Sequence, residues 1–343
     1  MHEQKIKNME QFAAVSGISR PTVSKYFNDP SSVRTSTRQK IEAALEQYDY
    51  RPNIYAINQN RRLTKNIGVI VPHIGDPFFA EMARNIETLI IAAGFRPMTL
   101  SAHGDANQEV ENLENLRSLR PAGVLMAPLG RSSHQEAIQA LCDEVPTILF
   151  DSHIVGMGAA FVGSNNNQSI GLIVNYLCET GEPPVFFEMR EPSNPNANKR
   201  RLAYLAAMEQ LGHRPHIIQA EGQGWDFEEI GYREGKRVIL QKLLRTNTIL
   251  CSNDRLAIGF LAAAFEMNLR VGGDDGYDIR VAGHDDHPFS RYTCPNLTTV
   301  SQDYSAIAET SAASLLQLID QEDHSPEDRV TLFDGALVIR GSA

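Results

Sequence analysis

The sequence has little cysteine and lacks long apolar runs. Its four cysteines, among 343 residues, show no C-x-x-C spacing, so neither a zinc site nor a disulfide framework is indicated. The longest apolar segment, 256–265, is too short to cross a bilayer and predicts a buried helix. The polar residues 1–10 lack the features of a secretory signal. We therefore expect a cytoplasmic protein without membrane contact.

Motifs of catalysis and metal binding are also missing. The chain has no G-x-S-x-G elbow, no P-loop and no G-x-G-x-x-G after its first predicted strand. His73, His153 and His284 stand at predicted strand ends, but their spacing is not that of a recognised metal site. We expect no catalytic residues, no metal and no cofactor, and predict that the chain is not an enzyme.

Charge is divided unevenly along the chain, although the total is -10. Residues 1–66 carry eleven Lys and Arg against six Asp and Glu, a balance of +5. The rest carries 21 basic and 36 acidic residues, a balance of -15. A basic head on an acidic body suits a protein that offers only its head to the phosphates of DNA.

The basic head has the pattern of a helix-turn-helix. Asn8 predicts the cap of a first helix, and Gly17 supplies the backbone freedom for the turn. Ser19 caps a second helix over 20–27, which turns its apolar residues inward. A third helix over 36–48 closes the unit, with Ile41, Leu45 and Tyr48 on one face. The polar positions of the second helix suit base edges and phosphates. They are Arg20, Pro21, Thr22, Ser24 and Lys25.

The head resembles that of the lactose-repressor/galactose-repressor (LacI/GalR) family of transcription regulators. The resemblance rests on Ala13-Ala14-Val15-Ser16-Gly17-Ile18-Ser19, Thr22-Val23-Ser24, Asn28, Val33, Thr37-Arg38 and Tyr50-Arg51-Pro52-Asn53. It implies a regulator, expected to be a repressor, that binds double-stranded operator DNA and is controlled by a small effector. Because one recognition helix is too small to specify a genomic site alone, we expect a homodimer on a pseudo-palindrome. The sequence ends without a leucine heptad, so a tetramer is not expected.

Residues 52–64 resemble the family's hinge helix, which lies in the minor groove of the operator. Asn53 can start this helix, and Ala56 keeps it thin. Gln59 stands where the family usually has a leucine that wedges between base pairs. Gln59 can read the minor-groove edge instead. Two alternatives stay open: Gln59 can lie on the outer face of the hinge helix near phosphate, or the helix can be shifted so that Ile57 supplies the wedge.

After residue 64, short β-rich runs alternate with helical segments. This alternation predicts two doubly wound, parallel-sheet lobes of the periplasmic-binding-protein type, with ligand chemistry at the carboxyl ends of the strands. The fold class is thus an all-α head on an α/β body. The expected parts are a head over 1–51, a hinge over 52–64 and a body over 65–343, divided into lobe 1 (about 65–162 and 297–331) and lobe 2 (about 163–296 and 332–343).

Polar and aromatic residues at the predicted strand ends match the family's effector site. A cleft that offers an arginine, carboxylates, amides and aromatic rings suits vicinal hydroxyls, since each hydroxyl both donates and accepts. The candidates are Asp76, Phe78, Phe79, Asp151, Arg200, Trp225, Asn253, Asp254 and Asp285. We expect a sugar, polyol or sugar acid as effector, with a nucleobase as second choice.

Several positions depart from the family pattern and leave alternatives open. Ser152 replaces a common arginine, and Trp225 is one residue out of register with the family's ring-stacking tryptophan. Trp225 can therefore pack on the ligand or on the lobe surface. Asp151 and Asp254 can be helix or strand caps instead of ligand contacts. A periplasmic solute receptor shares such a body, but it does not explain the basic head.

Overall fold

The computed structural model describes residues 6, 8–28, 30–50, 64–193, 195–274, 276–320 and 329–343. The chain forms two compact units, Met1–Thr64 and Lys65–Ala343. Of the residues expected in the hinge, Asn53, Ala56 and Gln59 lie outside the described part of the chain. In the described part, no helix is both long enough and apolar enough to span a membrane.

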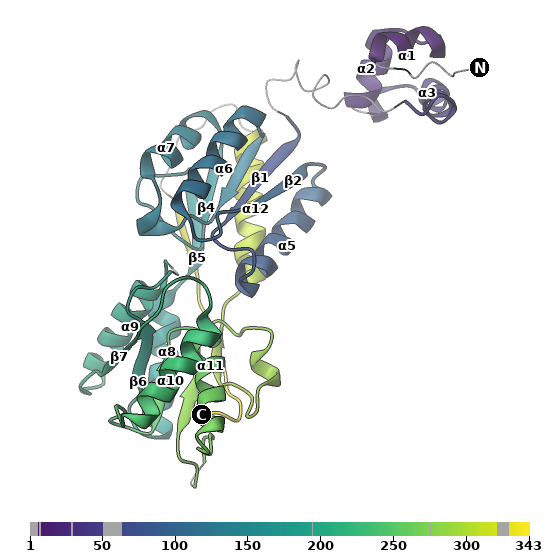
Figure 1. The fold of residues 1–343 in the computed structure, drawn as a ribbon. Coiled ribbons are helices and arrows are strands. Elements are labelled where there is room, and N and C mark those ends of the chain that lie inside the picture. The colour runs from purple at the N-terminus through teal and green to yellow at the C-terminus, as the bar shows by residue number, and fades with distance from the viewer. Residues whose placement is uncertain are drawn as a thin grey trace. The chain divides into compact units, whose positions relative to one another are not determined.

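The first unit is a three-helix head (Figure 1). Asn8 caps the first helix by accepting a hydrogen bond from the amide of Gln11, and Gly17 ends it with a φ of 65°. The predicted core was wrong at one place. Tyr48 is exposed, whereas Tyr50 is buried and stacks on Phe12 with ring centroids 4.7 Å apart. The helices are α1 (Met9–Ser16), α2 (Arg20–Asn28) and α3 (Thr35–Tyr48), with the short 3-10 helix η1 (Pro30–Ser32).

The second unit contains two lobes. Lobe 1 has a six-stranded parallel sheet in the order β11-β5-β4-β3-β1-β2. Its strands are β1 (Asn66–Val71), β2 (Arg96–Ser101), β3 (Gly123–Met126), β4 (Thr147–Phe150), β5 (Ala160–Ser164) and β11 (Arg329–Phe333). Its helices are α5 (Pro77–Ala92), α6 (Ala106–Leu119), α7 (Gln135–Glu144) and α12 (Tyr304–Asp320), with the 3-10 helix η2 (Gly130–Ser132).

Lobe 2 repeats this arrangement on a smaller scale. Its four parallel strands run in the order β7-β6-β8-β9, and a two-stranded antiparallel sheet lies beside them. The strands are β6 (Val185–Met189), β7 (Ile217–Ala220), β8 (Thr248–Cys251), β9 (Arg280–Ala282), β10 (Thr299–Ser301) and β12 (Ala336–Val338). The helices are α8 (Asn166–Thr180), α9 (Ala197–Gln210), α10 (Phe227–Leu240), α11 (Asp254–Glu266) and the 3-10 helix η3 (Ser290–Tyr292).

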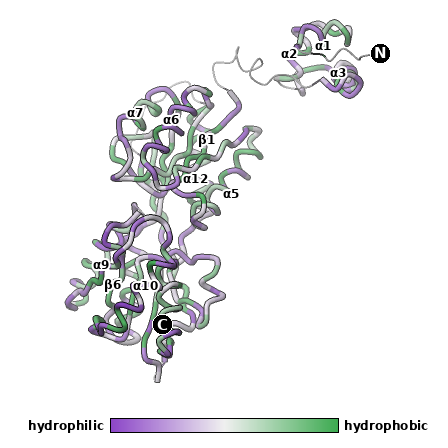
Figure 2. Tube along the Cα trace, viewed as in Figure 1, coloured by the Kyte–Doolittle hydropathy of each residue, from purple (hydrophilic) through white to green (hydrophobic). Residues whose placement is uncertain are grey.

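Both sheets are doubly wound, which confirms the predicted fold class. In each sheet the first strand along the chain lies between the second and the third: β1 lies between β2 and β3, and β6 lies between β7 and β8. Ligand-binding loops gather at this point, because the strand order changes direction there. Figure 2 shows hydrophobic residues along β1 and β6, the first strand of each sheet. The lobe limits expected at 162/163 and 331/332 fall inside β5 and β11, and both strands belong to the first sheet.

Candidate functional site

The start of α2 presents the predicted DNA-contacting side chains. Arg20, Pro21 and Lys25 are exposed, and Thr22 and Ser24 are half-buried. The Ser19 and Thr22 hydroxyls lie 2.8 Å apart, so they share a hydrogen bond at the start of the helix. Arg20 Nε lies 2.6 Å from Glu10 Oε1, and both side chains are more than half exposed. Such an exposed pair contributes little to stability and leaves Arg20 available to a stronger anion. The side chain of Asn28 lies outside the described part.

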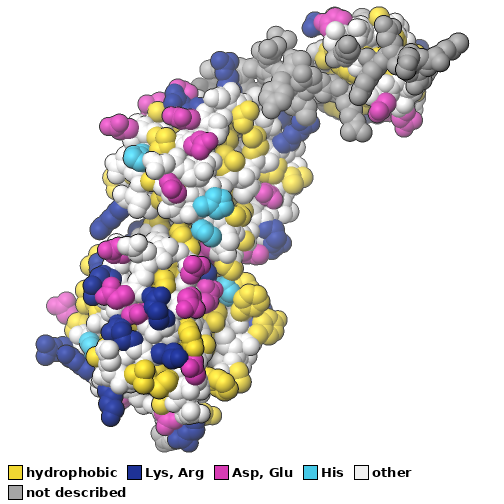
Figure 3. All heavy atoms as spheres, in the orientation of Figure 1, with side chains coloured by type: hydrophobic (Ala, Val, Ile, Leu, Met, Phe, Trp, Pro, Cys, Tyr) yellow, Lys and Arg dark blue, Asp and Glu magenta, His cyan; other side chains and the backbone are white. Residues whose placement is uncertain are grey.

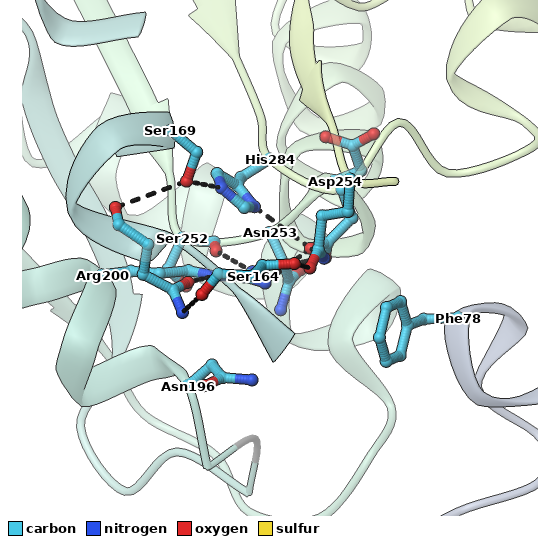
Figure 4. A network of polar contacts seen from close by, with 12 residues as sticks. Phe78, Ser164, Ser169, Asn196, Arg200, Ser252, Asn253, Asp254 and His284 are labelled. Carbon is cyan, nitrogen blue, oxygen red and sulfur yellow. Dashed lines mark hydrogen bonds and ion pairs between the residues drawn. The ribbon is translucent and has the colours of Figure 1, made fainter. Parts of the chain in front are cut away.

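In the second unit, Arg200 and Asp285 form a buried ion pair at the base of the cleft between the lobes. Arg200 is 2% exposed, and its two terminal nitrogens contact the two carboxylate oxygens of Asp285 at 2.6 and 3.3 Å. Arg200 also donates to the carbonyl of Ser252 at 2.8 Å and to Asn166 Oδ1 at 3.2 Å. The guanidinium is therefore fixed by partners on three sides (Figure 4).

The Oδ1 atom of Asp285 has two further hydrogen-bond donors besides Arg200. Gln302 donates to its Oδ1 at 2.7 Å, and His284 Nδ1 lies 3.1 Å from it. Burial raises the pKa of Asp285, but the Arg200 guanidinium and His284 outweigh burial and hold this pKa below its usual value. The Asp285 backbone has a φ of 126°, which is strained for a residue other than glycine. The carboxylate is thus ionised and held in one place.

Across the cleft, lobe 1 contributes Asp76 and Phe78. Asp76 caps α5 by accepting from the amide of Phe78 at 3.0 Å, and its other oxygen accepts from Arg255 of lobe 2 at 3.0 Å. Burial raises the pKa of Asp76, and Arg255 opposes that rise. The Phe78 ring lies edge-on to Phe79 and Tyr304, and it faces the polar network from the other lobe (Figure 4).

Asp151 lies at the end of β4, in the left-handed region, with a φ of 59°. Its Oδ1 accepts from Asn196 Nδ2 of lobe 2 at 2.8 Å. No donor among the described residues lies within hydrogen-bond distance of its Oδ2. Burial raises the pKa of Asp151 to about 6, against the effect of Lys199 and Arg200. A buried oxygen without a donor is a place where a ligand hydroxyl can bind.

The cavity enclosed by these residues is small in this closed arrangement. It measures about 10 Å³, which is room for about one water. An effector therefore enters only when the lobes separate. The lining residues are Asp76, Phe78, Asp151, Arg200, Asn253, Arg255, Asp285 and Gln302.

Three predicted residues do not line this cavity. Phe79 is 1% exposed and belongs to the hydrophobic core, because consecutive helix residues point about 100° apart. Asp254 is fully buried and accepts hydrogen bonds from the hydroxyls of Ser290 and Thr299, both at 2.6 Å. Its role is to fix lobe 2, whereas its neighbour Asn253 caps α11 and does reach the cavity.

Trp225, the third of them, joins the two lobes. Its ring stacks on His73 of lobe 1 with centroids 5.2 Å apart, and it lies edge-on to Phe79 at 6.0 Å. Gly104 is required beneath it, because a Cβ at this position lies only 2.5 Å from the indole nitrogen. Trp225 borders a larger cavity of about 880 Å³ at the side of the cleft. Trp225 thus packs on the facing lobe, and its contact with a ligand in this cavity stays a prediction.

Arg255 and Gln302 are cavity residues that the sequence did not reveal. Arg255 occupies the second position of α11, next to the predicted Asn253 and Asp254, and its guanidinium also contacts Glu228 at 2.6 and 2.7 Å. Gln302 directly follows β10, and its position at a strand end is the one available signal. Among the described residues, no group of His, Cys, Asp and Glu is arranged to hold a metal ion.

Comparison with known proteins matches two parts of the chain to known families. Residues 8–53 match the family "Bacterial regulatory proteins, lacI family", and residues 168–343 match the "Periplasmic binding protein-like domain". The ribose operon repressor of Escherichia coli K12 is 27% identical over 91% of this chain and 93% of its own length. The transcriptional repressor PurR of Erwinia tasmaniensis is 28% identical over 97% of both chains.

Among solved structures, the lac repressor dimer bound to operator and the anti-inducer ONPF covers 99% of both chains. Its TM-score is 0.84 at 24% identity, a level at which the likeness shows the fold. The similarity extends from the head to the last strand of the body, so it is not confined to one part.

Proposed function

We propose that this chain, which belongs to the lacI family of bacterial regulatory proteins, binds its operator under the control of a polyhydroxylated effector in the interlobe cleft. The chain is a DNA-binding transcription regulator with an effector-binding body; its relatives are repressors, not enzymes. The identity of the effector class and the residues that bind it are the proposed part. We place its action in the cytoplasm, where operator DNA is accessible.

The observation that carries the proposal is the fixed pair of Arg200 and Asp285 opposite an aromatic ring. Beyond its four contacts the guanidinium has one N–H to donate, and Asp285 Oδ2 accepts from one donor only, so the pair presents a donor beside an acceptor, which is what neighbouring hydroxyls need. Phe78 supplies an apolar face for the ring carbons of a sugar. The same ring can stack on a purine, which keeps a nucleobase as the second candidate.

Effector entry has to break contacts that cross the cleft, and one of them is an ion pair. Arg255 of lobe 2 binds Asp76 of lobe 1, and both side chains are at most 14% exposed. An effector that offers its own hydroxyls to Asp76 competes with Arg255 for the same oxygen. We infer that the Asp76–Arg255 pair lowers the affinity for an effector, because it stabilises the closed lobes in the absence of a ligand and has to be broken on binding.

A panel of ligands tests the effector class on the full-length protein. D-ribose, D-xylose, adenine and guanine are added separately, and the melting temperature is followed. A ligand at a hundred times its Kd stabilises the folded state by about 2.7 kcal/mol. A rise of several degrees with ribose or xylose supports a sugar effector. A rise with a purine alone selects the nucleobase, and no rise with either class contradicts both.

We propose a homodimer as the DNA-binding form. Phe265, Phe289 and Tyr292 are 63–80% exposed on lobe 2, and Ile91 is 60% exposed on lobe 1. Large apolar side chains of this kind mark association surfaces when they are gathered, and hydrophobic side chains gather along one side of lobe 2 (Figure 3). A monomer in sedimentation velocity at micromolar concentration contradicts this proposal.

Arg20 and Lys25 are proposed to read bases from the exposed face of α2. Replacing either with alanine is expected to change operator preference and to lower affinity, by about 1–3 kcal/mol for a bidentate contact. Selection of binding sites from random DNA measures both effects. Lys40→Ala, which removes an exposed charge from α3, is the control and is expected to keep the wild-type consensus. An unchanged consensus with Arg20→Ala and Lys25→Ala rejects their role in base reading.

A further inference from the structure

Lobe 2 has a groove along β7, the edge strand of its sheet, away from the interlobe cavity. The groove has a volume of about 680 Å³ and lies between β7 and the segment that follows α10. Its lining includes Arg190, Arg201, His216, Glu221, Lys242 and Arg245. A volume of this size suits a metabolite with a ring system.

The groove is basic, although the chain as a whole is acidic. Its lining contains four arginines and one lysine against two glutamates, whereas the whole chain has a net charge of -10. Figure 3 shows several Lys and Arg side chains on one part of lobe 2, interspersed with Asp and Glu. The groove therefore carries an excess of positive charge, whereas the body as a whole has a net negative charge.

Two of the five cations have no acidic partner to neutralise them. Arg190 pairs with Glu221, Arg201 with Glu188 at 3.3 Å, and Arg237 with Glu234 at 2.8 Å. Lys242 and Arg245 are exposed, and no carboxylate among the described residues forms an ion pair with either. Both follow the carboxyl end of α10, where a cation is favoured by the helix dipole, but the dipole does not explain why they border a groove.

The lining also provides contacts for an uncharged ring. Ile217, Leu243 and Leu244 are half-buried and supply apolar surface. The Nδ1 atom of His216 is buried and has no hydrogen-bond partner among the described residues. Burial and the nearby Arg245 lower the pKa of His216, so this nitrogen belongs to a neutral imidazole that can bind a polar ring atom.

We propose that this groove binds a phosphorylated small molecule that carries a ring, with Lys242 and Arg245 on its phosphates. The two glutamates do not prevent this, because Arg201 and Arg190 already neutralise them. The site is separate from the effector cavity, so it goes beyond the function proposed above. The regulator then responds to a phosphorylated metabolite in addition to its effector.

The groove is connected to the effector cavity by short segments of chain. Arg201 borders the groove, and the residue before it in α9, Arg200, binds Asp285 in the cavity. At one end of the groove, Glu221 begins the loop that leads to Trp225, the residue that joins the lobes. A ligand in the groove therefore lies beside residues of both segments.

Calorimetric titration of the full-length protein with ADP, pyrophosphate and adenosine tests the proposal at low ionic strength. We expect saturable binding of ADP, weaker binding of pyrophosphate and little heat with adenosine. In Lys242→Ala/Arg245→Ala, the affinity for ADP is expected to fall at least tenfold, since two charge-assisted contacts are lost. The melting temperature of the variant shows whether it is folded.

A variant with the same charge change elsewhere is the control. Arg270→Ala/Arg291→Ala removes two exposed arginines from the same lobe, outside the groove, and is expected to bind ADP as the wild type does. Equal losses in both double variants mean a general charge effect and overturn the proposal. It is also overturned if none of the three probes binds, or if poly-glutamate displaces ADP at lower concentration, which points to an acidic protein segment instead.

Discussion

Arg200→Lys is expected to weaken effector binding by ten- to a hundredfold. Arginine holds Asp285 with two nitrogens and also reaches Ser252 and Asn166, whereas the single ammonium of lysine cannot make all four contacts. Removing one such charged contact costs about 1.5–3 kcal/mol, which corresponds to the expected change in affinity. Calorimetric titration with the ligand that stabilises the wild type in the panel measures the loss.

Operator binding separates this role from general damage to the fold. The head folds as its own unit, so Arg200→Lys is expected to keep operator affinity and to lose only the response to effector. Arg201→Lys is the matched control, because Arg201 is the next residue and contacts Glu188 instead of Asp285. Unchanged effector affinity in Arg200→Lys removes Arg200 from the proposed site.

Much of the fold could be predicted because it depends on local patterns. The cap at Asn8, the glycine at the turn and the alternation of strands with helices are properties of neighbouring residues. Arg200 and Asp285 were predicted from the resemblance to a family, and the structure places them in contact. Neither periodicity nor composition predicts this contact, since 85 residues separate Arg200 and Asp285 in the chain.

Phe79 and Asp254 were predicted at the effector site but do not line the cavity, and the reason is the same for both. Phe78 and Phe79 are adjacent and chemically alike, and only the direction of each side chain from α5 decides which one faces the cleft. At the start of α11 the direction of the side chain likewise places Asn253 in the cavity and buries Asp254. Arg255 could not be predicted, because its partner Asp76 lies 179 residues away in the other lobe. Contacts between the two lobes leave no local pattern in the sequence.

His284 is expected to make the stability of lobe 2 depend on pH. This histidine is fully buried between Ser169, at 2.8 Å, and Asp285, at 3.1 Å. A carboxylate accepts only, so Nδ1 carries the proton donated to Asp285, and Nε2 lies 2.8 Å from the Ser169 hydroxyl, which is also 3.3 Å from the Asn166 carbonyl oxygen. Burial together with Arg200 lowers the pKa of His284 from 6.5 to about 4, so the ring is neutral at pH 7.

The sign follows from the lowered pKa. The unfolded chain binds a proton near pH 6.5 and the folded chain only near pH 4, so His284 contributes its full stability above pH 6.5 and loses it as the pH falls toward 4. Between pH 7.5 and 5, this loss amounts to about 2 kcal/mol. Because Asp151 and other acids titrate in the same range, the quantity to measure is the difference in free energy of unfolding between wild type and His284→Asn.

Urea unfolding of the full-length protein at pH 7.5, 6.5, 5.5 and 5.0 gives that difference. At pH 7.5 the wild type is expected to be the more stable protein, because asparagine is too short to span both Ser169 and Asp285. This advantage is expected to shrink by about 2 kcal/mol at pH 5. His213→Asn removes an exposed histidine from the same lobe and is expected to leave the profile unchanged. A difference that stays constant over the whole range means that the imidazole is not held neutral, and that Asp285 is positioned by Arg200 and Gln302 without it.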